Sequence, residues 1–272
     1  MLESWKVSIS FTFALSAQAV TCLVVIIVND RLPDRKEYPP LPDIILDNLP
    51  YASWGSTAAE MCLLILTILI LSLTVVHKNR AIMARRVFAL MGTMYLLRCV
   101  CIIVTSVPVP DPNKECDVFP AANIWHKLFR AFQMFSRMGV AVMGNRTCGD
   151  YIFSGHTAML TILNLFLNEY TPKSWKIFHF FCWTLNIMGM FFILLHRGHY
   201  SIDVVVAFYI SFQMFGNYHA LAESRLASWR ERRWSCICFP LLTFFESESD
   251  GPVANELCWP NWKSKLSSAL SV

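Results

Sequence analysis

Six long apolar stretches constrain the fold of this 272-residue sequence more than any other feature. A helix needs about 20 mostly apolar residues to cross a bilayer. Charged residues make up only 15% of the chain, against about 25% in a typical soluble domain, which disfavours a soluble fold. We therefore predict an all-α, polytopic membrane bundle of six transmembrane helices. The stretches cover residues 7–28, 54–76, 87–107, 153–170, 177–195 and 202–220.

The remaining composition narrows the function classes. A net charge of +4 is too small to indicate a nucleic-acid partner. The sequence contains no glycine-rich phosphate loop, EF-hand loop or HExxH motif, so we expect neither a metal nor a cofactor. We divide the chain into a six-span catalytic domain over residues 1–221 and a cytosolic C-terminal tail over 222–272.

The distribution of Lys and Arg places both termini in the cytosol, because basic residues concentrate in the 77–86 loop and in 225–233. The long third loop then lies outside. It repeats aromatic and aliphatic residues at helical spacing, which indicates either an amphipathic helix in the outer interface or a plain packed helix of the bundle. These residues are Trp125, Leu128, Phe129, Phe132 and Phe135.

The ten cysteines lie mostly inside apolar stretches, where we interpret them as small buried side chains. Cys116 and Cys148 instead fall in outer loops, where a disulfide and two free thiols both remain open. Cys236 and Cys238 lie beside basic residues at the membrane edge and are candidates for palmitoylation, with unmodified thiols as the default.

Two polar clusters open the fourth and sixth apolar stretches at the same side of the membrane. In the second cluster, His199 and Asp203 are four residues apart and would share one face of a helix. The carboxylate can accept the Nδ1–H of the imidazole and leave Nε2 as a nucleophile. On its own, such a pair is better explained by a structural hydrogen bond than by catalysis.

The first cluster, at the start of the fourth apolar stretch, favours a catalytic role over a structural one. Ser154, Gly155 and Thr157 place small residues and free backbone N–H groups at a helix N-terminus, which suits an anionic phosphate. His156 within this cluster can protonate a leaving oxygen as a general acid. Two histidines, a carboxylate and an anion-binding helix end indicate phosphoryl transfer without a metal, from a phosphoester already in the membrane.

Glu60 and Arg98 are charged residues placed deep within the second and third stretches. At 1.5 Å per residue their depths differ by about 5 Å, so we expect a buried ion pair. A phosphate-binding role for Arg98 is compatible with that pairing.

Four segments in this order resemble the sphingomyelin synthase family, within the lipid phosphate phosphatase superfamily. The resemblance is strongest to the sphingomyelin synthase-related branch, which is associated with ceramide phosphoethanolamine synthesis in the endoplasmic reticulum. In that branch a SAM domain precedes the first span, whereas this sequence begins almost directly at the span. The segments are Pro39–Asp43; Arg85 and Arg86 with Gly92, Tyr95 and Arg98; Cys148–Thr157; and His199–Val204.

The resemblance implies an enzyme that moves phosphocholine or phosphoethanolamine from phosphatidylcholine or phosphatidylethanolamine to ceramide through a phosphohistidine. It implies His156, His199 and Asp203 as catalytic residues, with Asp150 and Tyr200 as further site residues. Gly198 stands where relatives usually carry an acidic residue that bears on head-group choice, so the head group stays open.

The implied site faces the lumen or exterior of the endoplasmic reticulum, Golgi or plasma membrane. Two alternatives use the same residues: a lipid phosphatase or phospholipase C with water as acceptor, and a catalytically silent ceramide sensor. Self-association into a homo-oligomer is also left open.

Overall fold

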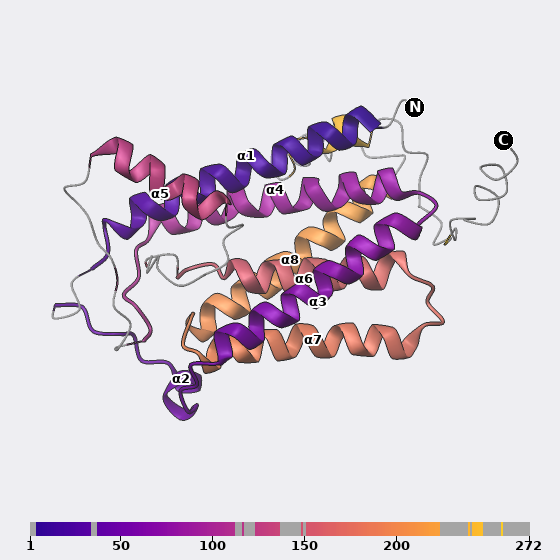
Figure 1. Cartoon of the computed structure of the whole chain (residues 1–272). Helices are drawn as coiled ribbons and strands as arrows, with labels where there is room; N and C mark the ends of the chain where they lie inside the picture. Colours follow the sequence, from indigo (N-terminus) through magenta and orange to yellow (C-terminus); the bar gives the residue numbers. More distant parts are fainter. Residues whose placement is uncertain are drawn as a thin grey trace, which may run out of the picture.

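The computed structural model describes residues 4–33, 37–111, 116, 123–136, 148, 151–223, 239, 241–246 and 257. Every regular element among these residues is a helix, and one isolated antiparallel bridge joins His77 to Leu257. Figure 1 shows the long helices running from one end of the molecule to the other, with α3 and α8 inclined to α1, α4 and α7. They are α1 (Ser4–Asn29), α2 (Ile44–Asn48), α3 (Gly55–Val76), α4 (Arg80–Val104), α5 (Ile124–Ser136), α6 (Gly155–Tyr170), α7 (Lys176–Leu195), α8 (Ser201–Glu223) and α10 (Leu242–Phe245).

Four of these helices, α1, α3, α4 and α7, are long and apolar enough to cross a bilayer, which identifies a membrane protein. The other two predicted spans form helices as expected, but they fall outside this set. With 16 residues, α6 is about 24 Å long, shorter than the hydrocarbon core of about 30 Å. Polar residues are buried within α8, among them Asp203, Ser211 and His219. The count of six spans therefore stays a prediction.

The helix of the third predicted span begins earlier than its apolar stretch, because α4 starts at Arg80, seven residues before that stretch. The predicted 77–86 loop is therefore reduced to residues 77–79. Charge marked this segment as a loop, yet Arg85 and Arg86 are each 1% exposed and pair with the carboxylate of Glu246. Burial with a counter-charge allows the helix to include them.

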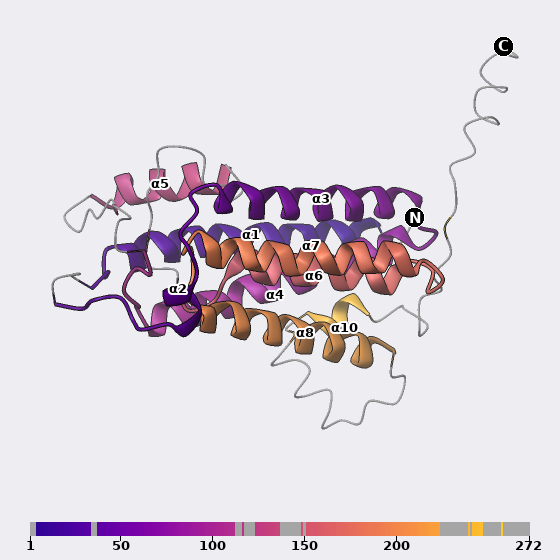
Figure 2. The same ribbon diagram turned by 90° about the horizontal axis from the view of Figure 1, so that it is seen from below.

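The central helix of the bundle is α6, which packs against α3, α4, α7 and α8. The most extensive helix–helix packing joins α1 to α4, and Figure 2 shows α5 lying near one end of α1. Close approach of α7 to α6 depends on Gly189, since a Cβ there would lie 2.7 Å from the Leu160 side chain. Small residues at such contacts are typical of membrane helix packing.

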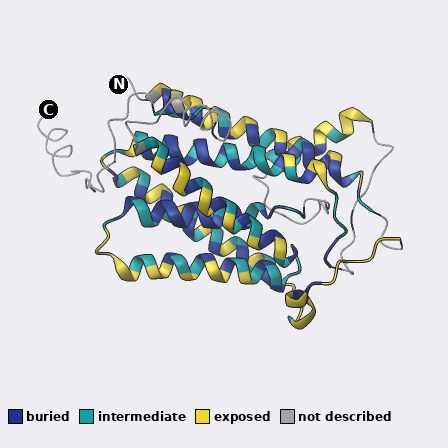
Figure 3. Cartoon of the chain, turned by 180° about the vertical axis from the view of Figure 1, so that it is seen from behind, coloured by how far each residue is buried: buried dark blue, intermediate teal, exposed yellow. Residues whose placement is uncertain are grey.

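The helix predicted in the third loop is present as α5 and packs against α1. Arg130 and Ala131 are buried, and Lys127 forms an ion pair with Asp30 at 2.6 Å. The apolar face of α5 is exposed, and many other large apolar residues of the long helices are exposed too. Figure 3 shows exposed residues in yellow along the outer helices. The placement of α5 in the membrane interface stays a prediction. The exposed residues include Trp125, Leu128, Phe129 and Phe132.

A short piece of the predicted tail packs into the bundle. Phe239, Leu242 and Phe245 belong to the same apolar core as the long helices. The boundary at residue 221 stays a prediction, and Cys236 and Cys238 lie outside the described residues.

Candidate active site

The first candidate pair, His199 and Asp203, lies where the turn after α7 leads into α8. His199 lies in a bend, and α8 begins two residues later at Ser201, so the expectation that the pair shares a helix face is wrong. The two side chains still meet: His199 Nδ1 lies 3.6 Å from Asp203 Oδ2, and His199 is 7% exposed. This separation exceeds a hydrogen bond, as is common for catalytic pairs without a bound substrate.

Asp203 has a second contact that the sequence spacing does not reveal. Its Oδ2 accepts the backbone N–H of Tyr200 at 3.0 Å. A carboxylate that reaches back from the third helical position in this way is half of a capping box. The oxygen that faces His199 is thus held in place by the start of α8.

The helix N-terminus predicted at this position is present as the start of α6, and the structure adds a side-chain cap from Ser154. The Ser154 hydroxyl oxygen accepts the Thr157 backbone N–H at 3.3 Å and the Thr157 hydroxyl at 3.0 Å. Both side chains are fully buried. His156, the second residue of α6, is partly buried. The helix dipole and free N–H groups at this end favour an anion.

Arg98 lies at the same helix end. Its Nε donates to the carbonyl of Phe153 at 2.9 Å, and a Cβ on Gly155 would lie 3.2 Å from its Cζ. A small pocket between α4 and α6 reaches this guanidinium, with Met94 and Met159 among its apolar lining residues. Glu60, on α3, is partly buried, and its pairing with Arg98 stays a prediction.

Tyr151 joins the two clusters. This residue is 1% exposed, and its ring packs edge-on against the His199 ring with centroids 6.0 Å apart. The segment that leads into α6 and the turn that leads into α8 are therefore neighbours, as their shared end of the bundle predicted (Figure 1). Asp150, another predicted site residue, lies outside the described residues.

Asp43 is part of this region, although the sequence did not single it out for the site. Its Oδ2 accepts the Ser201 backbone N–H at 2.7 Å and the Ser201 hydroxyl at 2.6 Å, while Oδ1 caps α2. Burial raises the pKa of this carboxyl, but the hydrogen bonds from Ser201, Leu46 and Ile45 outweigh burial and lower the pKa below its ordinary value. An Asp before a short apolar helix is a capping signal, yet nothing local points to Ser201.

Tyr200 ties the turn to two further segments. Its hydroxyl accepts the Leu41 backbone N–H at 3.1 Å and donates to the Pro108 carbonyl at 3.0 Å. Both partners lie outside the long helices. The predicted supporting role of Tyr200 therefore has a geometric basis in two loop contacts.

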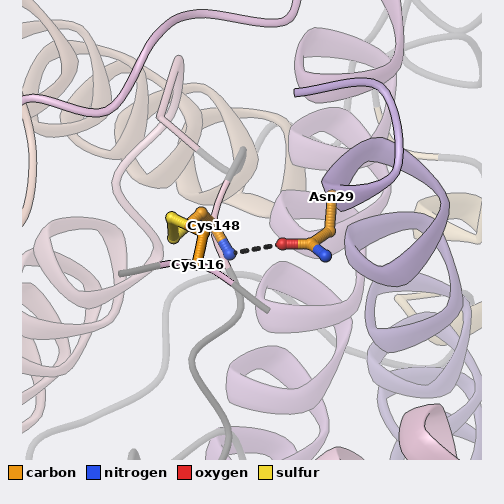
Figure 4. Close-up of a disulfide and its surroundings, with 3 residues drawn as sticks. All are labelled: Asn29, Cys116 and Cys148. Atoms are coloured by element: carbon orange, nitrogen blue, oxygen red, sulfur yellow. Dashed lines mark hydrogen bonds between the residues drawn. A yellow bond between two sulfur atoms is a disulfide. The ribbon is translucent and has the colours of Figure 1, made fainter. Parts of the chain in front are cut away.

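Cys116 and Cys148, whose state the sequence left open, form a disulfide (Figure 4). The backbone N–H of Cys148 donates to the Asn29 side-chain carbonyl at 2.7 Å. This contact fastens the chain shortly before α6 to the end of α1. Within the described parts of the chain, no three His, Cys, Asp or Glu side chains are grouped as metal ligands.

Comparisons with known proteins agree on one family. The PAP2 superfamily C-terminal model matches residues 147–220, which include both clusters. Human sphingomyelin synthase-related protein 1 is 44% identical over 268 residues, which are 98% of this chain and 64% of the relative. Rat phosphatidylcholine:ceramide cholinephosphotransferase 2 is 34% identical over 266 residues, 95% of this chain and 72% of the relative. The chain spans less than two thirds of the length of the human relative. The identities and the matched model show that it belongs to the sphingomyelin synthase family of the PAP2 superfamily.

Proposed function

We propose that this protein is a ceramide phosphotransferase that moves phosphocholine or phosphoethanolamine from a glycerophospholipid to the primary hydroxyl of ceramide. The observation that carries the proposal is the buried His199 beside Asp203, in contact with the segment that opens α6. Relatives named as ceramide cholinephosphotransferases support the substrate class. The site would lie at the lumenal or exterior end of six spans, in the endoplasmic reticulum or Golgi.

In the first step, His199 Nε2 attacks the phosphorus of the donor lipid. The bond from phosphorus to the diacylglycerol oxygen breaks, and His156 gives that oxygen its proton. Asp203, near Nδ1, stabilises the positive charge that develops on the imidazole. The products are diacylglycerol and a phosphohistidine.

In the second step, the now neutral His156 takes the proton of the ceramide hydroxyl. The hydroxyl oxygen attacks phosphorus, and the P–N bond electrons return to His199. One residue can serve as acid and then as base because the two steps are mirror images. Arg98 and the start of α6 would hold the phosphate oxygens through positive charge and N–H groups.

Lipid product analysis tests this function. The full chain is expressed in membranes of cells that lack both sphingolipid synthase activities, labelled ceramide is supplied, and products are identified by mass. We expect a phosphosphingolipid from the wild type and none from His199→Ala, whereas His126→Ala, which changes an exposed histidine, should retain the wild-type rate. Product formation by His199→Ala at the wild-type rate would refute the mechanism.

Omission of ceramide separates transfer from hydrolysis in the same membranes. A transferase releases little diacylglycerol without its acceptor, because the buried site disfavours water. Rapid diacylglycerol release without ceramide would instead identify a phospholipase C. The mass of the product also assigns the head group.

A further inference from the structure

The turn that carries His199 is fastened on both sides to one short segment of the first loop. After His199, Ser201 donates its backbone N–H and its hydroxyl to Asp43. Before His199, Arg197 donates from Nη2 to the carbonyl of Leu46 at 3.2 Å. Residues 43–46 thus hold the chain two residues before and two residues after the candidate nucleophile.

Asp43 suits this task because each of its carboxylate oxygens serves a different helix. Oδ1 accepts the N–H groups of Ile45 and Leu46 at 3.0 and 3.3 Å and so caps α2. Oδ2 accepts both donors of Ser201 at the start of α8. Asp43 is 8% exposed, so water competes weakly for these hydrogen bonds.

The other side of the turn has an unusual backbone. Arg197 adopts a positive φ of 54°, which residues other than glycine rarely do. The N–H groups of Arg197 and Gly198 bond the carbonyls of Leu194 and Ile193 at 2.9 and 3.1 Å, which is the Schellman pattern at a helix end. Such conformations persist where surrounding contacts hold them, and here the Leu46 carbonyl provides one.

We propose that Asp43 is a positioning residue for the reaction. By joining α2 to the start of α8, it sets the place of His199 relative to the start of α6, and it touches neither substrate nor phosphorus. This inference rests on the proposed function, in which His199 attacks the donor lipid.

The variant Asp43→Ser separates the two halves of the contact. Serine is a good N-cap, so α2 keeps its cap, but its side chain is too short to reach Ser201. We expect kcat to fall about 100-fold, since a displacement of about 1 Å costs that much, with the donor KM unchanged within about twofold. Asp47→Ser is the matched control, because Asp47 lies exposed on the same helix.

Ser201→Ala is the second variant and removes one of the two Ser201 donors while it leaves the carboxylate in place. It should give a kcat loss between those of Asp47→Ser and Asp43→Ser. A wild-type kcat in Asp43→Ser would overturn the proposal. Equal losses in Asp43→Ser and Asp47→Ser would also overturn it.

A second readout does not depend on turnover. Diethyl pyrocarbonate modifies accessible neutral histidines, and peptide mass spectrometry gives the rate at His199 and at His179, which lies at the far end of α7. Asp43→Ser should raise the rate at His199 alone. If Asp43→Ser raises the modification rate at both histidines through general unfolding, the same measurement is made on Ser201→Ala. A rise at both histidines in Ser201→Ala as well would overturn the proposal.

The two readouts separate this inference from the proposed function. A wild type without transfer or hydrolysis would refute the proposed function, while selective exposure of His199 in Asp43→Ser would still show that Asp43 holds the turn. An active wild type whose His199 reactivity is the same in Asp43→Ser would refute the positioning role alone.

Discussion

Glu246 is the centre of a buried charge network at the end of the bundle opposite the candidate site, and its removal gives the sharpest test of the fold. Its carboxylate accepts from Arg86 Nε and Nη2 at 3.2 and 2.8 Å and from the Tyr218 hydroxyl at 3.1 Å. Arg85 Nη2 lies 3.7 Å away. Both arginine side chains are 1% exposed and that of Glu246 is 8% exposed, so solvent screens these charges little.

Glu246→Gln keeps the shape of the side chain but removes the counter-charge of two buried arginines. The loss of one partner of a buried ion pair costs about 3–5 kcal/mol, because the remaining charge stays desolvated. For a chain of this size each kcal/mol lowers the melting temperature by about 2–4 °C. We therefore expect the midpoint to fall by about 10 °C.

The native cysteines provide the assay. The free thiols of Cys22, Cys62, Cys99 and Cys182 are buried and become accessible on unfolding. A fluorogenic maleimide added to detergent-solubilised protein during a thermal ramp reports this exposure. Comparison of the midpoints of wild type and variant then gives the shift.

Glu169→Gln is the matched control at the same end of the bundle. Glu169 pairs with Lys173 at 3.1 Å, with side chains 43% and 68% exposed, and exposed helix pairs of this kind contribute about 0.3–0.5 kcal/mol. Its midpoint should shift by less than about 2 °C. If Glu246→Gln melts as close to wild type as this control, the buried network does not stabilise the fold and the reasoning is refuted.

Three further predictions concern other parts of the chain. Gly155→Ala should raise the donor KM about tenfold, because its Cβ would lie 3.2 Å from the Cζ of Arg98 and displace the cation that we propose binds the phosphate; an unchanged KM would contradict that role. Burial lowers the pKa of His77, whose neutral Nδ1 accepts a backbone N–H at 3.0 Å. Because His77 then binds a proton more readily in the unfolded chain than in the folded one, stability falls as pH drops below 6.5. In His77→Gln the melting temperature should change less between about pH 7.5 and 5.5 than in the wild type. An equal dependence of melting temperature on pH in both proteins would count against the role of His77. Cys148→Ser removes a disulfide with a sequence separation of 32 and should lower the free energy of unfolding by about 4 kcal/mol, measured as a lower melting midpoint. Reductant should lower the midpoint of the wild type to the same extent and leave that of the variant unchanged.

The long helices were predictable because span length and apolar content are local properties. Five of the six predicted stretches start within two residues of the observed helices or lie inside them. The exception is α4, where Arg85 and Arg86 look like loop charges until Glu246, 160 residues further on, neutralises Arg86. No local pattern reveals that pairing.

The candidate site was partly predictable for the same reason. The spacing of His199 and Asp203 and the helix N-terminus at Ser154–Thr157 are short-range features, and the structure contains both the close pair and the helix start. The prediction that His199 lies in a helix was wrong, because His199 precedes the first residue of α8. The contact of Asp43 with Ser201 spans 158 residues and depends on how the first loop packs.

The sequence by itself determined that the chain forms apolar helices for a membrane and that both histidines lie at the same end of the bundle, because helix length and chain direction follow from local composition. Only the tertiary structure decided how the His199 turn is held, which arginines are buried and whether Cys116 and Cys148 are joined. These features depend on the packing of α2, α4 and α8 against segments distant in the chain. Buried charges and hydrogen-bond donors require partners, and packing alone determines which partners are within reach.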